Sequence, residues 1–511
     1  SGYNQTSSYG DVLAFINGLR SRNAPLAFGV IGKTSEGRDI PYMIASRPIV
    51  TTPEEARALG RPIVYVNANI HAGEVEGKEA LLALVRDLTY QRGPNVLDSL
   101  VLIAVPIYNA DGNEKFADEA INRGEQNGPQ LVGTRANGQK LDLNRDYVKA
   151  EAPETRASLA AFDRWDPDVF VDLHTTDGSF HGYALTYAPS LNPAALEAGA
   201  YTRDSLLPEL RRRMQARDGF AVFDYGNFDS GYEERDIADT VKRGWYSYDH
   251  RPRFGTNYVG LTQRISILSE AYSHDPFERR VKSTYAFVKE ILSLVAERGT
   301  RINEIEQRAD STLARGDTGR RVPIRSELTT HPDRLPVAFE VMAHTGDSSR
   351  TQPGVPRGYR RTGEFRTRPM PVYVRFDATD TRRIPNAWVL PAADTAAVAL
   401  LRLHGVQVEH LPNGVGGPMS EFAIDSVQSN PKEFQKHHET RVSGHWHTGS
   451  AHVTSEMWIV RGNQRHAVVA MYLLDPESDD GLVTWNVFDR ELAPGGTYPV
   501  RRLLLRADDS P

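Results

Sequence analysis

Cysteine is absent from the 511 residues of this chain. Disulfide bridges and thiolate metal sites are therefore excluded, and a bound transition metal must be held by His, Asp or Glu side chains. Long apolar runs are missing as well, because the longest one, at residues 100–108, is about half as long as a membrane-spanning helix. We therefore predict no membrane span.

A surplus of basic residues is also missing, since the net charge of the chain is −6. A general nucleic-acid-binding protein usually carries a basic surface, so we predict no nucleic-acid partner. Hydrophobic residues make up 40% and charged residues 25% of the chain, which is typical of a globular protein. A chain of this length exceeds a single hydrophobic core, so we expect more than one domain.

The first 315 residues alternate between strand-like and helix-like patterns. Continuous apolar, β-branched runs are typical of strands buried on both faces, and apolar residues at helical spacing indicate helices. The predicted strands are 62–70, 100–108, 168–174 and 264–272, and the predicted helices include 11–20, 75–88 and 273–315. This alternation predicts an α/β domain over residues 1–315, with a mixed central sheet flanked by helices.

The composition changes after Arg315, where residues 317–368 are rich in Gly, Pro, Thr, Ser and Arg. Beyond them lie short strand-like runs and one helix-like run. The strand-like runs are 372–376, 406–411, 454–460, 467–472 and 498–505, and the helix-like run is 394–404. We predict a second, β-rich α+β domain over residues 316–511, with no role assigned.

Ligand-capable side chains follow two of the predicted buried strands. His71 comes directly after the strand at 62–70, Glu74 lies three residues further on, and His174 ends the strand at 168–174. Ligands of open α/β sheets collect at the carboxyl ends of strands. Two His and one Glu form a catalytic zinc set that leaves a position open for water. Each residue alone also has an ordinary explanation, as a hydrogen-bonded His or as a Glu favoured at a helix start.

Six short motifs follow one another in order between residues 30 and 275. They are IGKTSEGR at 31–38, HAGE at 71–74, NADG at 109–112, LDLNR at 141–145, DLH at 172–174 and ILSE at 267–270. With these motifs, the chain resembles the zinc carboxypeptidase family related to carboxypeptidase A, peptidase family M14. It departs from the family pattern at Ala110, where the family usually has proline. Residues 473–486 resemble the tails of large bacterial members.

The resemblance implies a zinc carboxypeptidase-like fold and one zinc ion per chain. It assigns the metal ligands to His71, Glu74 and His174, and the general base to Glu270. Arg135 lies where relatives carry an arginine that stabilises the oxyanion of the transition state. Asp142 and Asp172 are candidates to orient the histidine ligands.

The resemblance also implies a substrate-binding set. Asn144 and Arg145 would bind the free C-terminal carboxylate of a peptide, because a guanidinium fork suits a carboxylate. A tyrosine would cover the substrate, and we favour Tyr248 over Tyr258. Arg251 and Arg253 would favour acidic substrates if they faced the cleft, a question that the sequence leaves open.

Hydrolysis of the C-terminal residue from peptides is therefore the expected activity. The same metal set also fits a zinc amidohydrolase that acts on N-acyl amino acids or peptidoglycan fragments. An inactive binding module on this scaffold is a third interpretation, although all the ligands and the base are present. The chain begins at Ser1, and we expect a protein exported to the periplasm or the extracellular space after removal of a signal peptide.

Four histidines of the second region lie close together in the sequence, at positions 437, 438, 445 and 447. Such a cluster could bind a second metal ion. Alternation along β-rich structure explains the same pattern equally well.

Overall fold

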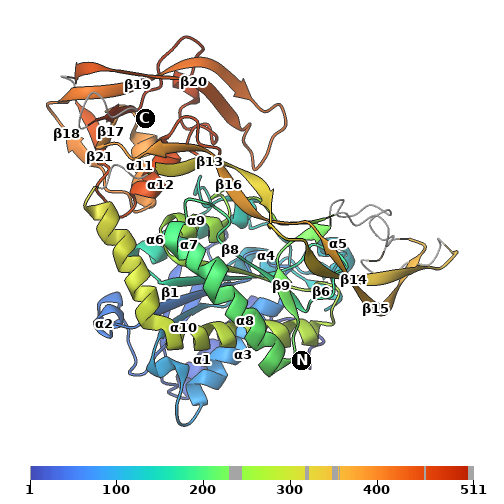
Figure 1. Ribbon diagram of the computed structural model, residues 1–511. Coiled ribbons are helices and arrows are strands. Elements are labelled where there is room, and N and C mark those ends of the chain that lie inside the picture. The colour runs from blue at the N-terminus through green and yellow to red at the C-terminus, as the bar shows by residue number, and fades with distance from the viewer. Residues whose placement is uncertain are drawn as a thin grey trace.

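The computed structural model describes residues 2–228, 244–316, 321–347, 355, 357–453 and 456–504 (Figure 1). Its centre is an eight-stranded sheet with the order β1-β2-β4-β3-β7-β12-β8-β9. The strands are β1 (Ala27–Lys33), β2 (Asp39–Ala45), β3 (Ile63–Ala68), β4 (Val101–Val105), β7 (Val169–Thr175), β8 (Leu185–Pro189), β9 (Val222–Asp224) and β12 (Ile265–Ala271). Because β4, β3, β7 and β12 are parallel neighbours, their carboxyl ends meet at one edge of the sheet.

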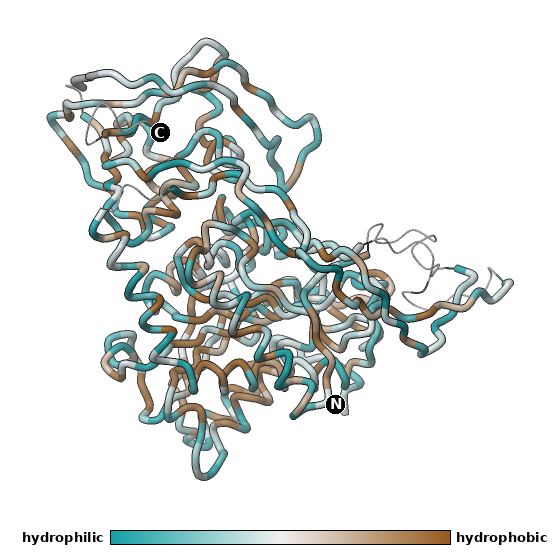
Figure 2. The backbone as a smooth tube through the Cα atoms, viewed as in Figure 1, coloured by the Kyte–Doolittle hydropathy of each residue, from teal (hydrophilic) through white to brown (hydrophobic). Residues whose placement is uncertain are grey.

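Helices cover both faces of this sheet. The α-helices of this region are α1 (Tyr9–Ser21), α2 (Pro53–Ala58), α3 (Glu76–Tyr90), α4 (Ala110–Asn113), α5 (Glu119–Asn122), α6 (Pro153–Trp165), α7 (Leu196–Tyr201), α8 (Leu207–Arg213), α9 (Gly255–Leu261) and α10 (Phe277–Ala314). Val64 and Val66 of β3 pack with α1, α3 and α10, whereas Ile63 and Tyr65 pack with α6 and α9 on the opposite face. Each middle strand is therefore apolar on both sides, which explains its continuous apolar run. Hydrophobic segments accordingly gather inside this body (Figure 2).

The C-terminal region contains a six-stranded sheet, drawn at the top of Figure 1, with the order β18-β21-β17-β22-β19-β20. Its strands are β17 (Ala387–Pro391), β18 (Glu409–Leu411), β19 (Val415–Ser429), β20 (Thr440–Val453), β21 (Met457–Arg461) and β22 (Arg501–Leu503), with helices α11 (Thr395–Leu403) and α12 (Ala467–Leu474). The predicted fold class, a mixed α/β sheet flanked by helices with a β-rich C-terminal region, is confirmed.

Strands from the two predicted regions also pair with each other. β13 (Arg321–Thr330) and β16 (Val372–Arg383) join β10 (Asn227–Phe228) and β11 (Trp245–Tyr246) in one four-stranded sheet. The hairpin of β14 (Leu335–His344) and β15 (Tyr359–Met370) meets the first region through a bridge from His181 to Phe339. A small pair of strands, β5 (Ala117–Asp118) and β6 (Leu131–Val132), completes the fold. The domain division at residues 315 and 316 stays a prediction.

One secondary-structure prediction was wrong. Residues 467–472 were predicted as a strand but lie in helix α12, of which every residue is buried. A helix buried all round shows no polar face, so its apolar run looks the same as that of a buried strand. The strands β13, β14 and β15, within or overlapping 317–368, were also not predicted. Residues 454, 455 and 505 of two predicted strands lie outside the described residues.

The two regions are joined by buried ion pairs. Arg253 donates to Asp480 at 2.7 Å and lies 2.6 Å from Glu439, both in the C-terminal region. Its side chain is only 3% exposed. Arg251 pairs with Asp249 at 2.6 Å. Both arginines are therefore engaged by protein carboxylates, which removes the basis for expecting them to select acidic substrates.

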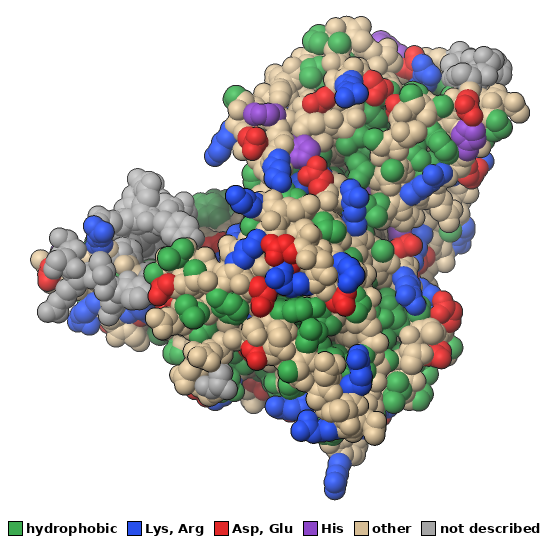
Figure 3. All heavy atoms as spheres, turned by 180° about the vertical axis from the view of Figure 1, so that it is seen from behind, with side chains coloured by type: hydrophobic (Ala, Val, Ile, Leu, Met, Phe, Trp, Pro, Cys, Tyr) green, Lys and Arg blue, Asp and Glu red, His purple; other side chains and the backbone are tan. Residues whose placement is uncertain are grey.

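On the face shown in Figure 3, acidic and basic side chains are interspersed.

Replacing Asp480 by Asn should destabilise the protein, because it leaves the buried Arg253 without one of its two carboxylates. Removing one partner of a buried pair costs about 3–5 kcal/mol, and we expect the lower end since Glu439 remains. Urea denaturation measures this change. The control is Glu278→Gln in the exposed Lys282 pair, which should leave the denaturation midpoint unchanged. Equal midpoints for both variants would contradict this account of the interface.

Candidate metal centre

The turn that follows β3 brings His71 and Glu74 to the same point. Asn69 adopts a left-handed backbone conformation with φ of 66°, and its amide donates to the carbonyl of Glu74 at 3.4 Å. Gly73 leaves no room for a side chain, since a Cβ there would lie 2.7 Å from Cγ of Arg123. The chain therefore reverses within a few residues and enters α3 with Glu74 beside His71.

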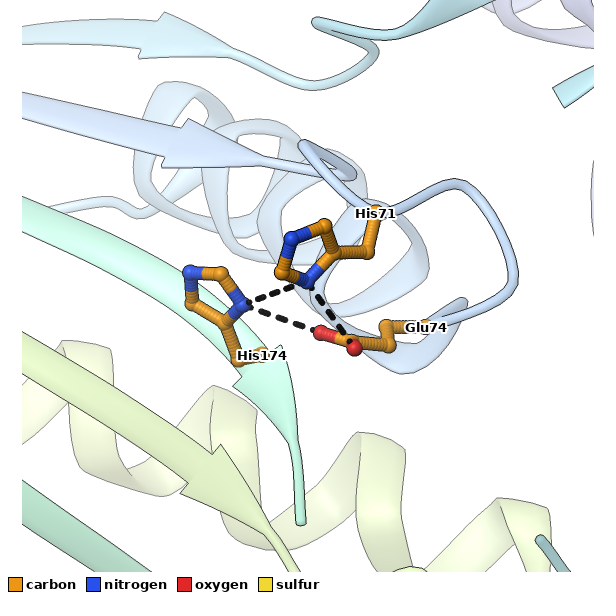
Figure 4. Close-up of side chains that lie close together, drawn as sticks. All are labelled: His71, Glu74 and His174. Atoms are coloured by element: carbon orange, nitrogen blue, oxygen red, sulfur yellow. Dashed lines mark hydrogen bonds and ion pairs between the residues drawn. The ribbon is translucent and has the colours of Figure 1, made fainter. Parts of the chain in front are cut away.

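His71, Glu74 and His174 converge at the carboxyl ends of β3 and β7 (Figure 4). Nδ1 of His71 lies 3.0 Å from one Glu74 oxygen, and Nδ1 of His174 lies 3.0 Å from the other. The two Nδ1 atoms are 3.2 Å apart. All three side chains are buried. The sequence predicted these three residues, and the structure brings them together.

Each histidine is held by a carboxylate at its outer nitrogen. Nε2 of His71 lies 2.9 Å from Asp142, and Nε2 of His174 lies 3.0 Å from Asp172. A carboxylate only accepts, so these contacts place the proton of each neutral ring on Nε2 and leave a lone pair on Nδ1. Two lone pairs and a carboxylate therefore face one another, which is a donor set that fits Zn²⁺.

Two arginines contact the Glu74 carboxylate. Arg123 donates to it at 2.9 Å, and Arg135 does so at 3.4 Å. Burial alone would raise the pKa of Glu74, but His71 and Arg123 beside it hold that pKa well below its usual range. Arg123 also donates to the carbonyls of residues 175 and 176. The sequence analysis missed Arg123, which lies in no recognised motif.

Glu270 lies on β12, directly beside His174 of β7 in the parallel register. Its side chain is 8% exposed. Burial raises the pKa of the Glu270 carboxyl well above its usual range, and the negative charge of Glu74 adds to the shift. The structure thus places a carboxyl group with a raised pKa on the strand next to a candidate ligand.

The predicted substrate-binding residues, Asn144 and Arg145, follow Asp142 in the chain. Arg145 stacks over the ring of Phe254 at 4.0 Å and donates to the backbone carbonyl of Asn144 at 2.8 Å. The Asn144 side chain accepts from the backbone of Gly255 at 2.8 Å, which joins this segment to α9. Both residues are therefore held in position by the start of α9.

Of the two candidate tyrosines, Tyr248 lies beside this set. Its ring is 5.1 Å from that of Phe254, the ring on which the Arg145 guanidinium stacks. Tyr258 is 3% exposed and donates to or accepts from His404 at 2.8 Å, inside the core. Tyr258 is therefore not available to cover a substrate.

Two of the sequence motifs build the scaffold of the site. Asp111, in NADG, accepts a hydrogen bond from Arg38, in IGKTSEGR, at 2.7 Å. Asn109 donates to the carbonyls of Ile70 and Arg135, each at 3.1 Å. These contacts attach the chain before His71 to the loop of Arg135. These two motifs, NADG and IGKTSEGR, thus hold the site together without contributing catalytic groups.

Within the described residues, the triad is the one group of His, Asp or Glu arranged to hold a metal ion. The C-terminal histidines make other contacts: His437 lies 2.9 Å from Glu151, and His445 lies 3.3 Å from Asp425.

No helix in the described part of the chain is long and apolar enough to span a membrane. Export stays a prediction.

Comparisons with known proteins find similar carboxypeptidases. Residues 12–248 match the family model described as zinc carboxypeptidase. Carboxypeptidase 2 of Trichophyton rubrum is 24% identical over 502 residues, which cover 96% of this chain and 85% of the relative. Carboxypeptidase 2 of Trichophyton equinum is 23% identical over 92% of this chain and 81% of the relative. Residues 12–248 are therefore similar to zinc carboxypeptidases, and the relatives that span most of the chain are carboxypeptidases, which are peptide hydrolases.

The solved structures that match parts of the chain have low sequence identity to it. The metallo-carboxypeptidase of Burkholderia cenocepacia is 18% identical with a TM-score of 0.41, over 57% of this chain and 70% of that chain. The metallo-carboxypeptidase of Pseudomonas aeruginosa, in complex with (2-guanidinoethylmercapto)succinic acid, is 19% identical with a TM-score of 0.40, over 59% and 71%.

Replacing Asp172 by Asn should weaken zinc retention about 10–100-fold, because the carboxylate that orients His174 is lost. Zinc release to a competing chelator measures this. The matched control is Asp168→Asn, just before the other end of β7, where the carboxylate accepts from the backbone of Ile63. Zinc retention that falls equally in both variants would show that Asp172 acts only on the stability of the strand.

Proposed function

We propose that this chain is a zinc carboxypeptidase that removes the C-terminal residue from peptides. The observation that supports it best is the convergence of His71, Glu74 and His174, with both Nδ1 atoms directed at Glu74. One zinc ion per chain would be held by these three side chains. When bound, zinc supplies a Lewis acid and lowers the pKa of a coordinated water to about 7.

Glu270 is the proposed general base. It accepts a proton from the attacking water and then passes that proton to the amine that leaves. Its position beside His174 on the neighbouring strand supports this role.

Arg135 is proposed to stabilise the carbonyl oxygen that becomes negatively charged during attack. Its side chain is 38% exposed, while Nε is held by Asp142 at 2.9 Å. Arg123 is only 5% exposed and is engaged with Glu74 and two backbone carbonyls. The difference in exposure favours Arg135 as the arginine that reaches the substrate and Arg123 as the one that holds Glu74.

Arg145, with Asn144, is proposed to bind the free C-terminal carboxylate of the substrate. Its side chain is 22% exposed, and its guanidinium stacks on the Phe254 ring. Asp142 lies 4.0 Å away, so the pair leaves donor capacity on Arg145 for a bidentate contact. Tyr248, whose ring lies 5.1 Å from that of Phe254, is proposed to cover the bound residue.

A Glu270→Gln variant should keep zinc and lose turnover, because an amide cannot accept the proton. General-base catalysis contributes about 10²–10⁴-fold, so kcat should fall by about that factor. Metal analysis and peptide hydrolysis are measured on the same sample. Glu306→Gln, a buried Glu on α10, serves as the control and should retain activity. Unchanged turnover in Glu270→Gln would refute the proposed mechanism.

The wild-type protein should hydrolyse a peptide with a free C-terminus and not the same peptide with an amidated C-terminus. In Arg145→Met, KM for the free peptide should rise about 100-fold, which is the loss of roughly 3 kcal/mol from a charge-assisted bidentate contact. Hydrolysis of N-acyl amino acids is measured in parallel. Equal rates on free and amidated peptides would refute the role of Arg145, and faster turnover of N-acyl amino acids would favour an amidohydrolase.

A further inference from the structure

A tight turn of the C-terminal region reaches the metal centre. Phe434 and His437 exchange two backbone hydrogen bonds, of 2.8 and 3.0 Å, and enclose two residues. These two residues are Gln435 and Lys436. The Oε1 atom of Gln435 accepts a hydrogen bond from the backbone N–H of Asp142 at 2.9 Å. A residue almost 300 positions further along the chain therefore completes the backbone bonding of Asp142.

The residues at the tip of this turn do not suit its backbone. Gln435 and Lys436 have φ values of 51° and 67°. A two-residue hairpin with two positive φ values strongly favours Asn-Gly, Asp-Gly or Gly-Gly. Residues in an unfavourable backbone conformation persist where the surrounding structure holds them in it. The side chain of Gln435 uses its length to reach Asp142, which neither Gly nor Asn could do.

Asp142 connects the groups that the proposed mechanism uses. One carboxylate oxygen lies 2.9 Å from Nε2 of His71 and 2.9 Å from the backbone N–H of Asn144. The other accepts from Arg135 at 2.9 Å and lies 4.0 Å from Arg145. A rotation or shift of this one residue would move a candidate metal ligand and the substrate-binding arginines together.

We propose that Gln435 is a positioning residue of the metal centre: by holding the backbone of Asp142, it makes the C-terminal region a working part of the active site. This inference rests on the proposed function, because the groups that it positions are those of the carboxypeptidase mechanism. Gln435 touches no candidate metal ligand itself and acts through Asp142.

Other contacts hold the C-terminal region in place without Gln435. Arg253 pairs with Asp480 and Glu439 in a buried position, and His437 lies 2.9 Å from Glu151. Changing Gln435 should therefore leave the two regions docked. This separation allows a positioning role to be distinguished from a purely structural one.

The experiment compares four variants of the full chain. Gln435→Gly and Gln435→Asn suit the turn better but lose the contact to Asp142, whereas Gln435→Glu keeps an acceptor of the same reach. Lys436→Gly is the matched control, since it relaxes the same turn and leaves Gln435 in place, while it removes only an exposed hydrogen bond of 3.1 Å from Lys436 to the carbonyl of Gln139. For each we measure the melting temperature, zinc release to a chelator, and kcat and KM on a peptide.

We expect Gln435→Gly and Gln435→Asn to melt at or above the wild-type temperature, yet to release zinc about tenfold faster and to lose about tenfold in kcat/KM. Gln435→Glu should keep most of the zinc retention and most of the kcat/KM of the wild type. Lys436→Gly should match the wild type in both quantities. Zinc release and kcat/KM within twofold of wild type in all variants would overturn the proposal. So would losses that follow the melting temperature alone. A wild-type protein that retains zinc but hydrolyses no peptide would refute the proposed function, while zinc release would still test Gln435.

Discussion

Two imidazole nitrogens lie 3.2 Å apart at one edge of the central sheet, and each lies 3.0 Å from a different oxygen of the Glu74 carboxylate. The outer nitrogens of His71 and His174 face aspartates, so electron pairs point inward from both rings. Such an arrangement is stable when a cation lies between the donors. Because β3 and β7 are neighbouring parallel strands, the sheet itself brings the two histidines together. The proposed base, on β12, is aligned by the same sheet.

The surroundings of the triad are arranged to keep it in this geometry. Arg123 and Arg135 neutralise the charge of Glu74, while Asp142 links one histidine to the residues proposed to bind substrate. The C-terminal region extends this support through Gln435. The six-stranded sheet at the top of Figure 1 thus carries the turn at 434–437, from which the side chain of Gln435 contacts Asp142.

Much of the central fold was predictable because its strands are buried on both faces, which leaves unbroken apolar runs such as that of β3. The metal triad was predictable because its residues follow those runs and lie in recognised motifs. Arg123 and Gln435 were not, since their roles come from contacts between segments that are distant in the sequence. Helix α12 was misassigned because complete burial removes the polar face that marks a helix. The substrate roles of Arg145 and Tyr248 stay predictions.

The most direct test of the central claim is X-ray absorption spectroscopy at the zinc edge on the zinc-loaded protein, compared with a His174→Ala variant. We predict one zinc ion per chain with two imidazole nitrogens at about 2.0–2.1 Å in the wild type, and a single imidazole in the variant. Zinc that binds with fewer than two imidazoles in the wild type, or with an unchanged spectrum in the variant, would contradict the account.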